Sequence, residues 1–362
     1  MQQKPLFLRI QVLRLVAAVA VVGYHAQITA ISYFGGPSPY KILEFGSYGV
    51  DLFFVISGFI IVFIGSTRER RPSVFAVRRI VRVIPLYWLM TALTFALTHI
   101  PGLARLEISG PYHLLQSTLF ISWMNGPETY PVLNVGWTLE YEMFFYIIAA
   151  LSMALTPRPW LAASFAMCAT VLSGHGTAFF LQNPIMLEFV FGMTIGAYLY
   201  DRSSFPWMAA GALFVLLTLP FESAAWRVWA FGLPSTALVA IAIYADAHKT
   251  YTGKLLPELG NASFSIYLAH VIAISFACKL GLIVVPHMPA ALAIPIIAIF
   301  AIAMGYILYR LIERRLIILF HKRRAVVQSR VLIEPTVNAS IRSTPRGTGA
   351  AVESVDANSL DG

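Results

Sequence analysis

Long apolar segments follow one another along most of this chain and constrain its fold more than any other feature. A bilayer core of about 30 Å requires about 20 apolar residues in a helix that crosses it. Only 12% of the residues are charged, which is too few to cover the surface of a soluble domain. We therefore predict an all-α, polytopic membrane helix bundle with about ten transmembrane helices. The segments are 6–31, 46–65, 83–100, 136–156, 159–174, 177–200, 206–220, 228–245, 263–285 and 290–312.

Basic residues gather in a few short stretches between these segments. The loop 66–82 holds Arg68, Arg70, Arg71, Arg78, Arg79 and Arg82, and further basic residues follow residue 313. The loops of the opposite side hold only Arg105 and Arg227. Because positive loops stay in the cytoplasm, we predict that both termini are cytoplasmic. The same clustering argues against a nucleic-acid-binding protein, so no nucleic acid is expected as a partner.

The composition changes near the end of the chain. Residues 335–362 are rich in Ser, Thr, Asn, Pro and Gly and cannot bury a core. We predict a transmembrane domain over 1–324 and a disordered cytoplasmic tail over 325–362. Cys168 and Cys278 both lie in apolar segments, which excludes a disulfide framework and a CxxC zinc site. No metal centre is expected.

Ionisable side chains inside the spans are the first candidates for function, because burying them in a membrane is costly. Arg14 and His25 are eleven residues apart, so they share one helix face about 16 Å apart along the axis. Asp51 in the second span is predicted to lie near the depth of His25, where it would orient the imidazole. Alternatively, Arg14 extends to the membrane surface and His25 caps a buried carbonyl.

Arg79 and Arg82 are three residues apart at a predicted helix start and share a face. Such a pair suits a diphosphate or a 3′-phosphate, because guanidinium groups form bidentate bonds with phosphate oxygens. The alternative is that both arginines only set topology and contact lipid headgroups. Spacing alone favours this alternative.

Other polar residues lie near these groups in the predicted bundle. Ser57 follows Asp51 in the second span, and a hydroxyl that bonds to its own helix is the favoured interpretation. Glu140 and Glu142 are 200° apart on the fourth span, so at most one lies beside His25. Glu140 is expected near the outer surface, in contact with water. His270 in the ninth span is equally compatible with a structural and a functional role.

Taken together, these segments resemble the bacterial membrane acyltransferase family 3, in its exopolysaccharide and Nod-factor O-acetyltransferase branch. The similarity covers about residues 8–315. It rests on Arg14 with His25, the GVDLFFVISGF segment at 49–59, and Arg79 with Arg82 before Ile84–Tyr87. It rests also on the pattern from Trp137 to Tyr146 and on Ser265, Tyr267, Leu268 and His270.

The resemblance implies an O-acyltransferase with acyl-CoA, chiefly acetyl-CoA, as donor and no permanently bound cofactor. It makes His25 the catalytic histidine, assigns Arg14, Arg79 and Arg82 to the donor, and selects Glu142 over Glu140. We expect Asp51 or Glu142 to balance the charge of His25. Ser57, Trp137, Tyr267 and His270 are possible supporting residues.

The expected acceptor is a hydroxyl of a surface polysaccharide or its lipid-linked precursor, and the expected location is the bacterial inner membrane, among membrane lipids. His25 would act as a general base or carry the acyl group itself, and the sequence leaves both routes open. A transporter or flippase for a lipid-linked or anionic solute is the alternative, since intramembrane His and Glu also form proton relays. A structural subunit of an export complex is a third hypothesis.

Overall fold

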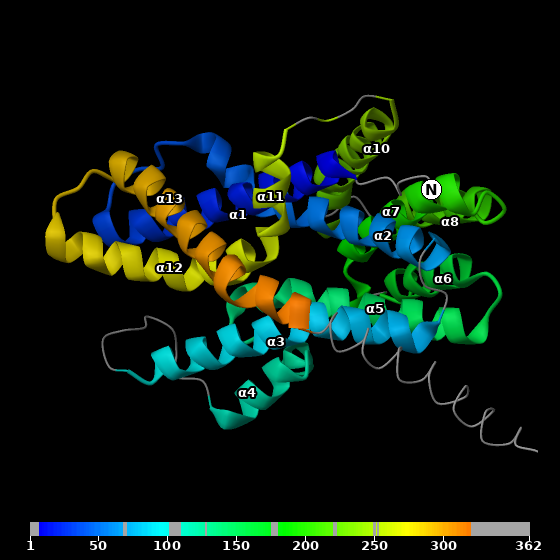
Figure 1. Ribbon diagram of the computed structural model, residues 1–362, viewed down its shortest axis with the longest axis horizontal. Helices are drawn as coiled ribbons and strands as arrows, with labels where there is room; N and C mark the ends of the chain where they lie inside the picture. Colours follow the sequence, from blue (N-terminus) through cyan, green and yellow to red (C-terminus); the bar gives the residue numbers. More distant parts are fainter. Residues whose placement is uncertain are drawn as a thin grey trace, which may run out of the picture. The chain divides into compact units, whose positions relative to one another are not determined.

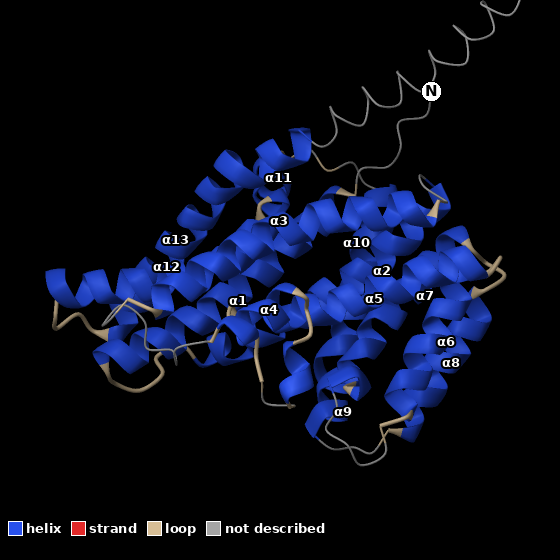
Figure 2. Cartoon of the chain, turned by 90° about the horizontal axis from the view of Figure 1, so that it is seen from below, coloured by secondary structure: helices blue, strands red, loops and turns tan. Residues whose placement is uncertain are grey.

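The computed structural model describes residues 7–67, 71–100, 110–126, 129–174, 180–219, 223–248, 251 and 253–319. In these ranges the chain forms helices joined by loops, with no β-strand (Figures 1 and 2). The predicted all-α class is confirmed. The α-helices are α1 (Leu8–Phe34), α2 (Gly49–Thr67), α3 (Pro72–Thr98), α4 (Pro111–Thr118), α5 (Trp137–Leu155), α6 (Pro159–Leu172), α7 (Leu187–Tyr200), α8 (Phe205–Thr218), α9 (Ser223–Arg227), α10 (Leu233–His248), α11 (Leu255–Asn261), α12 (Ser263–Val284) and α13 (Ala290–Leu308). The 3₁₀ helices are η1 (Lys41–Tyr48), η2 (Ser122–Asn125), η3 (Asn134–Gly136), η4 (Phe180–Gln182) and η5 (Pro184–Met186), and the π-helical turns are η6 (Val228–Gly232) and η7 (Tyr309–Glu313).

The chain divides into two compact units. The first is Met1–Arg315 and contains all the named helices. The second is Leu316–Gly362, of which residues 316–319 are described and are helical. The predicted tail over 325–362 lies outside the described residues.

Every predicted apolar segment contains a helix, but the helices differ in length. Seven helical segments of the described chain are long and apolar enough to cross a membrane, among them Lys41–Thr67, which joins η1 to α2. Three others, Pro159–Leu172, Pro184–Tyr200 and Phe205–Thr218, are shorter. The protein is therefore a helical membrane protein, while ten crossings and the cytoplasmic termini remain predictions.

The third helix differs most from its predicted bounds. The apolar run predicted a span from residue 83, yet α3 begins at Pro72. Proline is favoured in the first turn of a helix because its missing N–H has no intrahelical partner there. Arg79 and Arg82 consequently lie inside α3, more than a turn beyond its start, and not in the loop that precedes it.

The helix α1 packs against η1 and α2 on one side and against α11 and α12 on another. A Cβ atom on Gly49 would lie 2.5 Å from the carbonyl oxygen of Ala17, so η1 and α2 run back along α1 in close contact. On another side, Gly260 approaches Gln11 and Gly281 approaches Phe34, so α12 runs parallel to α1. In Figure 1, α12 and α13 lie beside each other as an antiparallel pair.

The helices α2 and α7 cross with almost no space between their backbones. A Cβ atom on Gly192 would lie 2.0 Å from the carbonyl oxygen of Val55, and one on Gly58 would lie 2.1 Å from that of Phe189. Small residues allow this approach, which is how membrane helices gain van der Waals contact without a hydrophobic driving force. The crossing holds α2, and with it Asp51 and Ser57, in a fixed position.

Candidate active site

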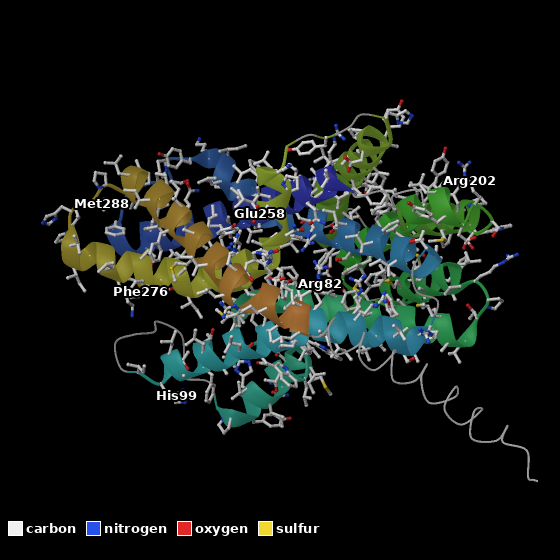
Figure 3. All side chains as sticks on the ribbon, viewed as in Figure 1. Arg82, His99, Arg202, Glu258, Phe276 and Met288 are labelled. Atoms are coloured by element: carbon white, nitrogen blue, oxygen red, sulfur yellow. The ribbon has the colours of Figure 1, made fainter. Side chains whose placement is uncertain are left out.

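Three arginine side chains converge on one pocket between α1, α2, α3, α5 and α12. Arg14, Arg79 and Arg82 line it, and the pocket holds about 730 Å³ with its open mouth included. Arg79 is buried, and its guanidinium lies 5.4 Å from the ring centroid of Tyr146 and 5.6 Å from that of Phe75. Figure 3 shows Arg82 among the helices, whereas Arg202 lies at the end of α7. The structure thus brings together the three arginines singled out in the sequence.

Glu142 lines the same pocket and joins two of its walls. Ser57 Oγ on α2 donates a hydrogen bond of 2.9 Å to Glu142 Oε1, and the hydroxyl of Tyr146 donates to the same oxygen. The expectation that Ser57 bonds only to its own helix is therefore wrong. The predicted partnership of Glu142 with His25 is not found among the described contacts, in which the Glu142 carboxylate accepts from Ser57 and Tyr146 instead.

A second carboxylate approaches the arginines from η7, the π-helical turn that follows α13. Glu313 is buried and accepts a hydrogen bond of 2.5 Å from Ser265 Oγ. Its charge acts on both Arg14 and Arg82. Two carboxylates, Glu142 and Glu313, thus face three guanidinium groups, and positive charge remains in the pocket among the described residues.

The other end of the pocket is formed by Thr138 and Tyr267. Their hydroxyl groups are 2.9 Å apart, and Tyr267 also donates to the carbonyl oxygen of Val135 at 3.0 Å. Thr138 and Tyr146 are eight residues apart on α5, so the two ends are separated by about 12 Å. Phe53 contacts the Tyr267 ring, with 5.9 Å between ring centroids.

His25 lies beside a second histidine one helical turn beyond Tyr267. His25 Nδ1 is 3.3 Å from Nε2 of His270, and their ring centroids are 4.9 Å apart. His270 is fully buried, while His25 is half-buried and does not line the pocket itself. The sequence singled out both histidines but did not predict their contact.

Asp51 has a different partner from the one predicted. Its two carboxylate oxygens accept from Nε and Nη2 of Arg227 at 3.0 and 2.7 Å, in a bidentate pair, and Asp51 itself is fully buried. The predicted depth is wrong because Gly49 already lies against Ala17, eight residues or about 12 Å before His25 on α1. From the sequence alone, no role is predicted for Arg227 beyond a place in a loop. Its position on the side with few basic residues was the one sequence feature that could have indicated a specific partner.

Glu140 is buried rather than solvated. It is 2% exposed, and its Oε1 accepts a hydrogen bond of 2.9 Å from the backbone N–H of Ser122. The expected contact with water is therefore wrong, because the segment containing η2 folds over α5. The two glutamates do face different neighbours, as their angular separation predicts.

Two further residues complete the predicted set. Trp137 begins α5 and packs edge-on against Phe54 and Tyr141, with ring centroids 6.5 and 5.9 Å away, so it supports the pocket wall without lining it. Within the described ranges, no group of three or more His, Cys, Asp or Glu residues has the proximity needed to hold a metal ion.

A pocket with three arginines and an adjoining histidine pair, set in a bundle of apolar helices, defines a candidate enzyme embedded in a membrane. Residues 7–310 match the family model of the acyltransferase domain Acyl_transf_3. The chain therefore belongs to acyltransferase family 3 and is an acyltransferase, as the motifs indicated.

Two relatives extend this comparison. The exopolysaccharide production protein ExoZ of Rhizobium meliloti (strain 1021) is 34% identical over 295 residues, which cover 75% of this chain and 90% of ExoZ. The acyltransferase MdmB of Streptomyces mycarofaciens is 26% identical over an alignment of 368 positions, which covers 87% of this chain and 92% of MdmB. No solved structure matches the chain significantly.

Proposed function

We propose that this acyltransferase moves an acyl group, chiefly acetyl, from cytoplasmic acyl-CoA to a hydroxyl of an exopolysaccharide or its lipid-linked precursor. The proposed location is the bacterial inner membrane. The similarity to ExoZ, an exopolysaccharide production protein, supports the polysaccharide acceptor. The observation that carries the proposal is the convergence of Arg14, Arg79 and Arg82 on a pocket whose far end adjoins the histidine pair.

The arginines supply what an acyl-CoA donor requires. Coenzyme A carries a diphosphate and a 3′-phosphate, and a guanidinium binds phosphate through paired, charge-assisted hydrogen bonds. Because three guanidinium groups face two carboxylates among the described residues, the pocket favours an anion. The thioester would then extend along the apolar side of the pocket, past Phe53, toward Tyr267 and the histidines.

In the proposed reaction the acceptor hydroxyl loses its proton to His25 while its oxygen bonds to the thioester carbonyl carbon. The carbon–sulfur bond breaks, and the departing thiolate takes the proton from His25, which returns the imidazole to its neutral form. In the second route, His25 bonds to the acyl carbon as the carbon–sulfur bond breaks and coenzyme A leaves as a thiolate. The hydroxyl oxygen then bonds to the acyl carbon as the bond to His25 breaks, and the hydroxyl proton passes to the thiolate. Both routes require an unprotonated ring nitrogen on His25.

Glu142 is proposed to hold the donor pocket in shape rather than to assist His25 directly. Its carboxylate accepts from Ser57 and Tyr146 and compensates part of the arginine charge. Arg79 then lies against the ring of Tyr146, so three helices are joined around the phosphate-binding end.

The test is a comparison of surface glycans. The gene is deleted, ester-linked acyl groups on the purified glycan are measured by NMR, and the gene is restored as wild type or as His25→Ala. We expect the esters to disappear on deletion and to return only with the wild-type gene. Normal esterification with His25→Ala at equal protein level would contradict the mechanism.

The same experiment separates the other two hypotheses. A transporter or flippase would change where the glycan is found without changing its ester content per sugar. A structural subunit would restore export and esters alike when His25 is replaced. The arginine pocket beside the histidines has no evident use in either class.

A further inference from the structure

The proton on His270 can be assigned from its surroundings. His270 lies fully buried in α12, with Nδ1 2.5 Å from the carbonyl oxygen of Tyr267. A carbonyl oxygen only accepts hydrogen bonds, so Nδ1 carries the proton. In the neutral ring Nε2 then holds a lone pair. Burial favours the neutral ring, because no carboxylate of the described residues acts on His270.

The proton on His25 follows in the same way. Its Nδ1 is 2.9 Å from the carbonyl oxygen of Val21 and 3.3 Å from Nε2 of His270. Both neighbours are acceptors, so Nδ1 of His25 is the donor to both. The lone pair of His25 is therefore on Nε2.

We infer that His270 is a positioning residue for acyl transfer: it accepts from Nδ1 of His25 and fixes Nε2 of His25 as the reacting atom. This inference rests on the proposed function. Nε2 takes the hydroxyl proton, or bonds to the acyl carbon in the covalent route. His270 stays neutral in both.

A histidine here replaces the carboxylate that orients the base in a Ser-His-Asp triad. Both carboxylates considered for that task are engaged elsewhere, since Asp51 pairs with Arg227 and Glu142 bonds Ser57. A neutral acceptor orients the ring without the strong attraction of an anion for the imidazolium. The proton taken by His25 is consequently passed on more readily to the leaving thiolate.

Other histidines of the chain show why the second acceptor matters. His99 and His248 also place Nδ1 2.8 Å from the carbonyl oxygen four residues earlier, and both are exposed. The contact of His25 with Val21 is thus an ordinary feature of histidine on a helix. Among the described residues, His25 differs from these two in its contact with another imidazole.

The tautomer is measured first, because it does not depend on activity. Protein labelled with ¹⁵N only in histidine is placed in lipid nanodiscs at neutral pH, and the His25 signals are assigned by their loss in His25→Ala. We expect a protonated Nδ1 and an unprotonated Nε2 on His25. The opposite tautomer would overturn the inference, even if the protein proves to be an acyltransferase as proposed.

Kinetics then test the role of His270. His270→Leu removes the acceptor, and His270→Gln restores one, because the amide oxygen lies near the position of Nε2. We expect His270→Leu to lower kcat about 10–100-fold with an unchanged KM for the donor, since general-base catalysis contributes about 10²–10⁴-fold and Val21 still orients the ring. His270→Gln should recover to within a few-fold of wild type.

A packing control distinguishes a positioning role from a structural one. Ile274 is buried one turn further along α12, so Ile274→Ala disturbs the same interface without touching the pair. We expect it to keep kcat near the wild-type value. Unchanged kcat in His270→Leu, or equal impairment of the Leu, Gln and Ile274→Ala variants, would overturn the positioning role. A wild-type protein without transferase activity would refute the proposed function instead, and the NMR result would still decide the tautomer.

Discussion

The bidentate pair between Asp51 and Arg227 gives a prediction whose size follows from the structure. Asp51→Asn removes the negative charge from a fully buried site while the guanidinium stays in place. Breaking a buried ion pair by removing one partner costs about 3–5 kcal/mol. Two features reduce this cost. The Arg227 side chain is 24% exposed, so water still solvates part of it, and the negative charge of Glu188 also acts on its guanidinium.

We therefore expect Asp51→Asn to lower the free energy of unfolding by about 2 kcal/mol, or about 30-fold in the ratio of folded to unfolded protein. The assay is reversible unfolding in mixed micelles with increasing SDS. Glu258→Gln is the matched control, because its pair with Arg310 is 3.2 Å long but exposed on both sides. Such a pair contributes about 0–1 kcal/mol.

The double variant Asp51→Asn with Arg227→Gln completes the test. It removes both charges, so it should be more stable than Asp51→Asn alone. If Asp51→Asn is no less stable than Glu258→Gln, or if the double variant gains nothing, Arg227 is not the partner of Asp51. The role of Asp51 beside His25 would then have to be reconsidered.

Three further predictions follow from single contacts. Glu140→Gln should keep folding and activity because its amide oxygen still accepts from Ser122, whereas Glu140→Ala should cost about 1–3 kcal/mol in unfolding measurements by leaving that N–H unpaired. Gly192→Leu should abolish folded protein in size-exclusion profiles, whereas Gly211→Ala, which meets only the Phe165 ring at 3.5 Å, should not. Arg79→Lys should weaken donor binding in calorimetry less than Arg79→Ala, because charge remains but the bidentate fork is lost. Equal behaviour within any of these pairs would contradict the corresponding contact.

The helices could be predicted from the sequence where apolar runs define them. The start of α3 could not, because hydropathy falls at Arg79 and Arg82 while the helix continues back to Pro72. Helical periodicity and spacing also anticipated the shared face of Arg14 and His25. Spacing on one helix does not reveal which residues of distant helices meet.

The sequence predicted which residues belong to the site better than it predicted which side chains contact one another. Asp51 and Arg227 are 176 residues apart in sequence, and no local pattern connects them. The depth of Asp51 depended on Gly49 lying against Ala17, which is a property of packing. Glu140 was expected at the surface because it lies near the end of its span. Its burial depends on the folding of η2 over α5 and on a hydrogen bond from the backbone of Ser122, which no local pattern reveals.

Acyl transfer by purified protein is the direct test of His25 as the catalytic residue of a glycan acyltransferase. Wild type and His25→Ala are reconstituted in liposomes with ¹³C-acetyl-CoA and deacylated glycan, and the glycan is examined by ¹³C NMR. We expect a labelled ester on the glycan with wild-type protein and none with His25→Ala. Equal labelling by the two proteins, or no labelled ester with the wild type, would contradict this function of His25.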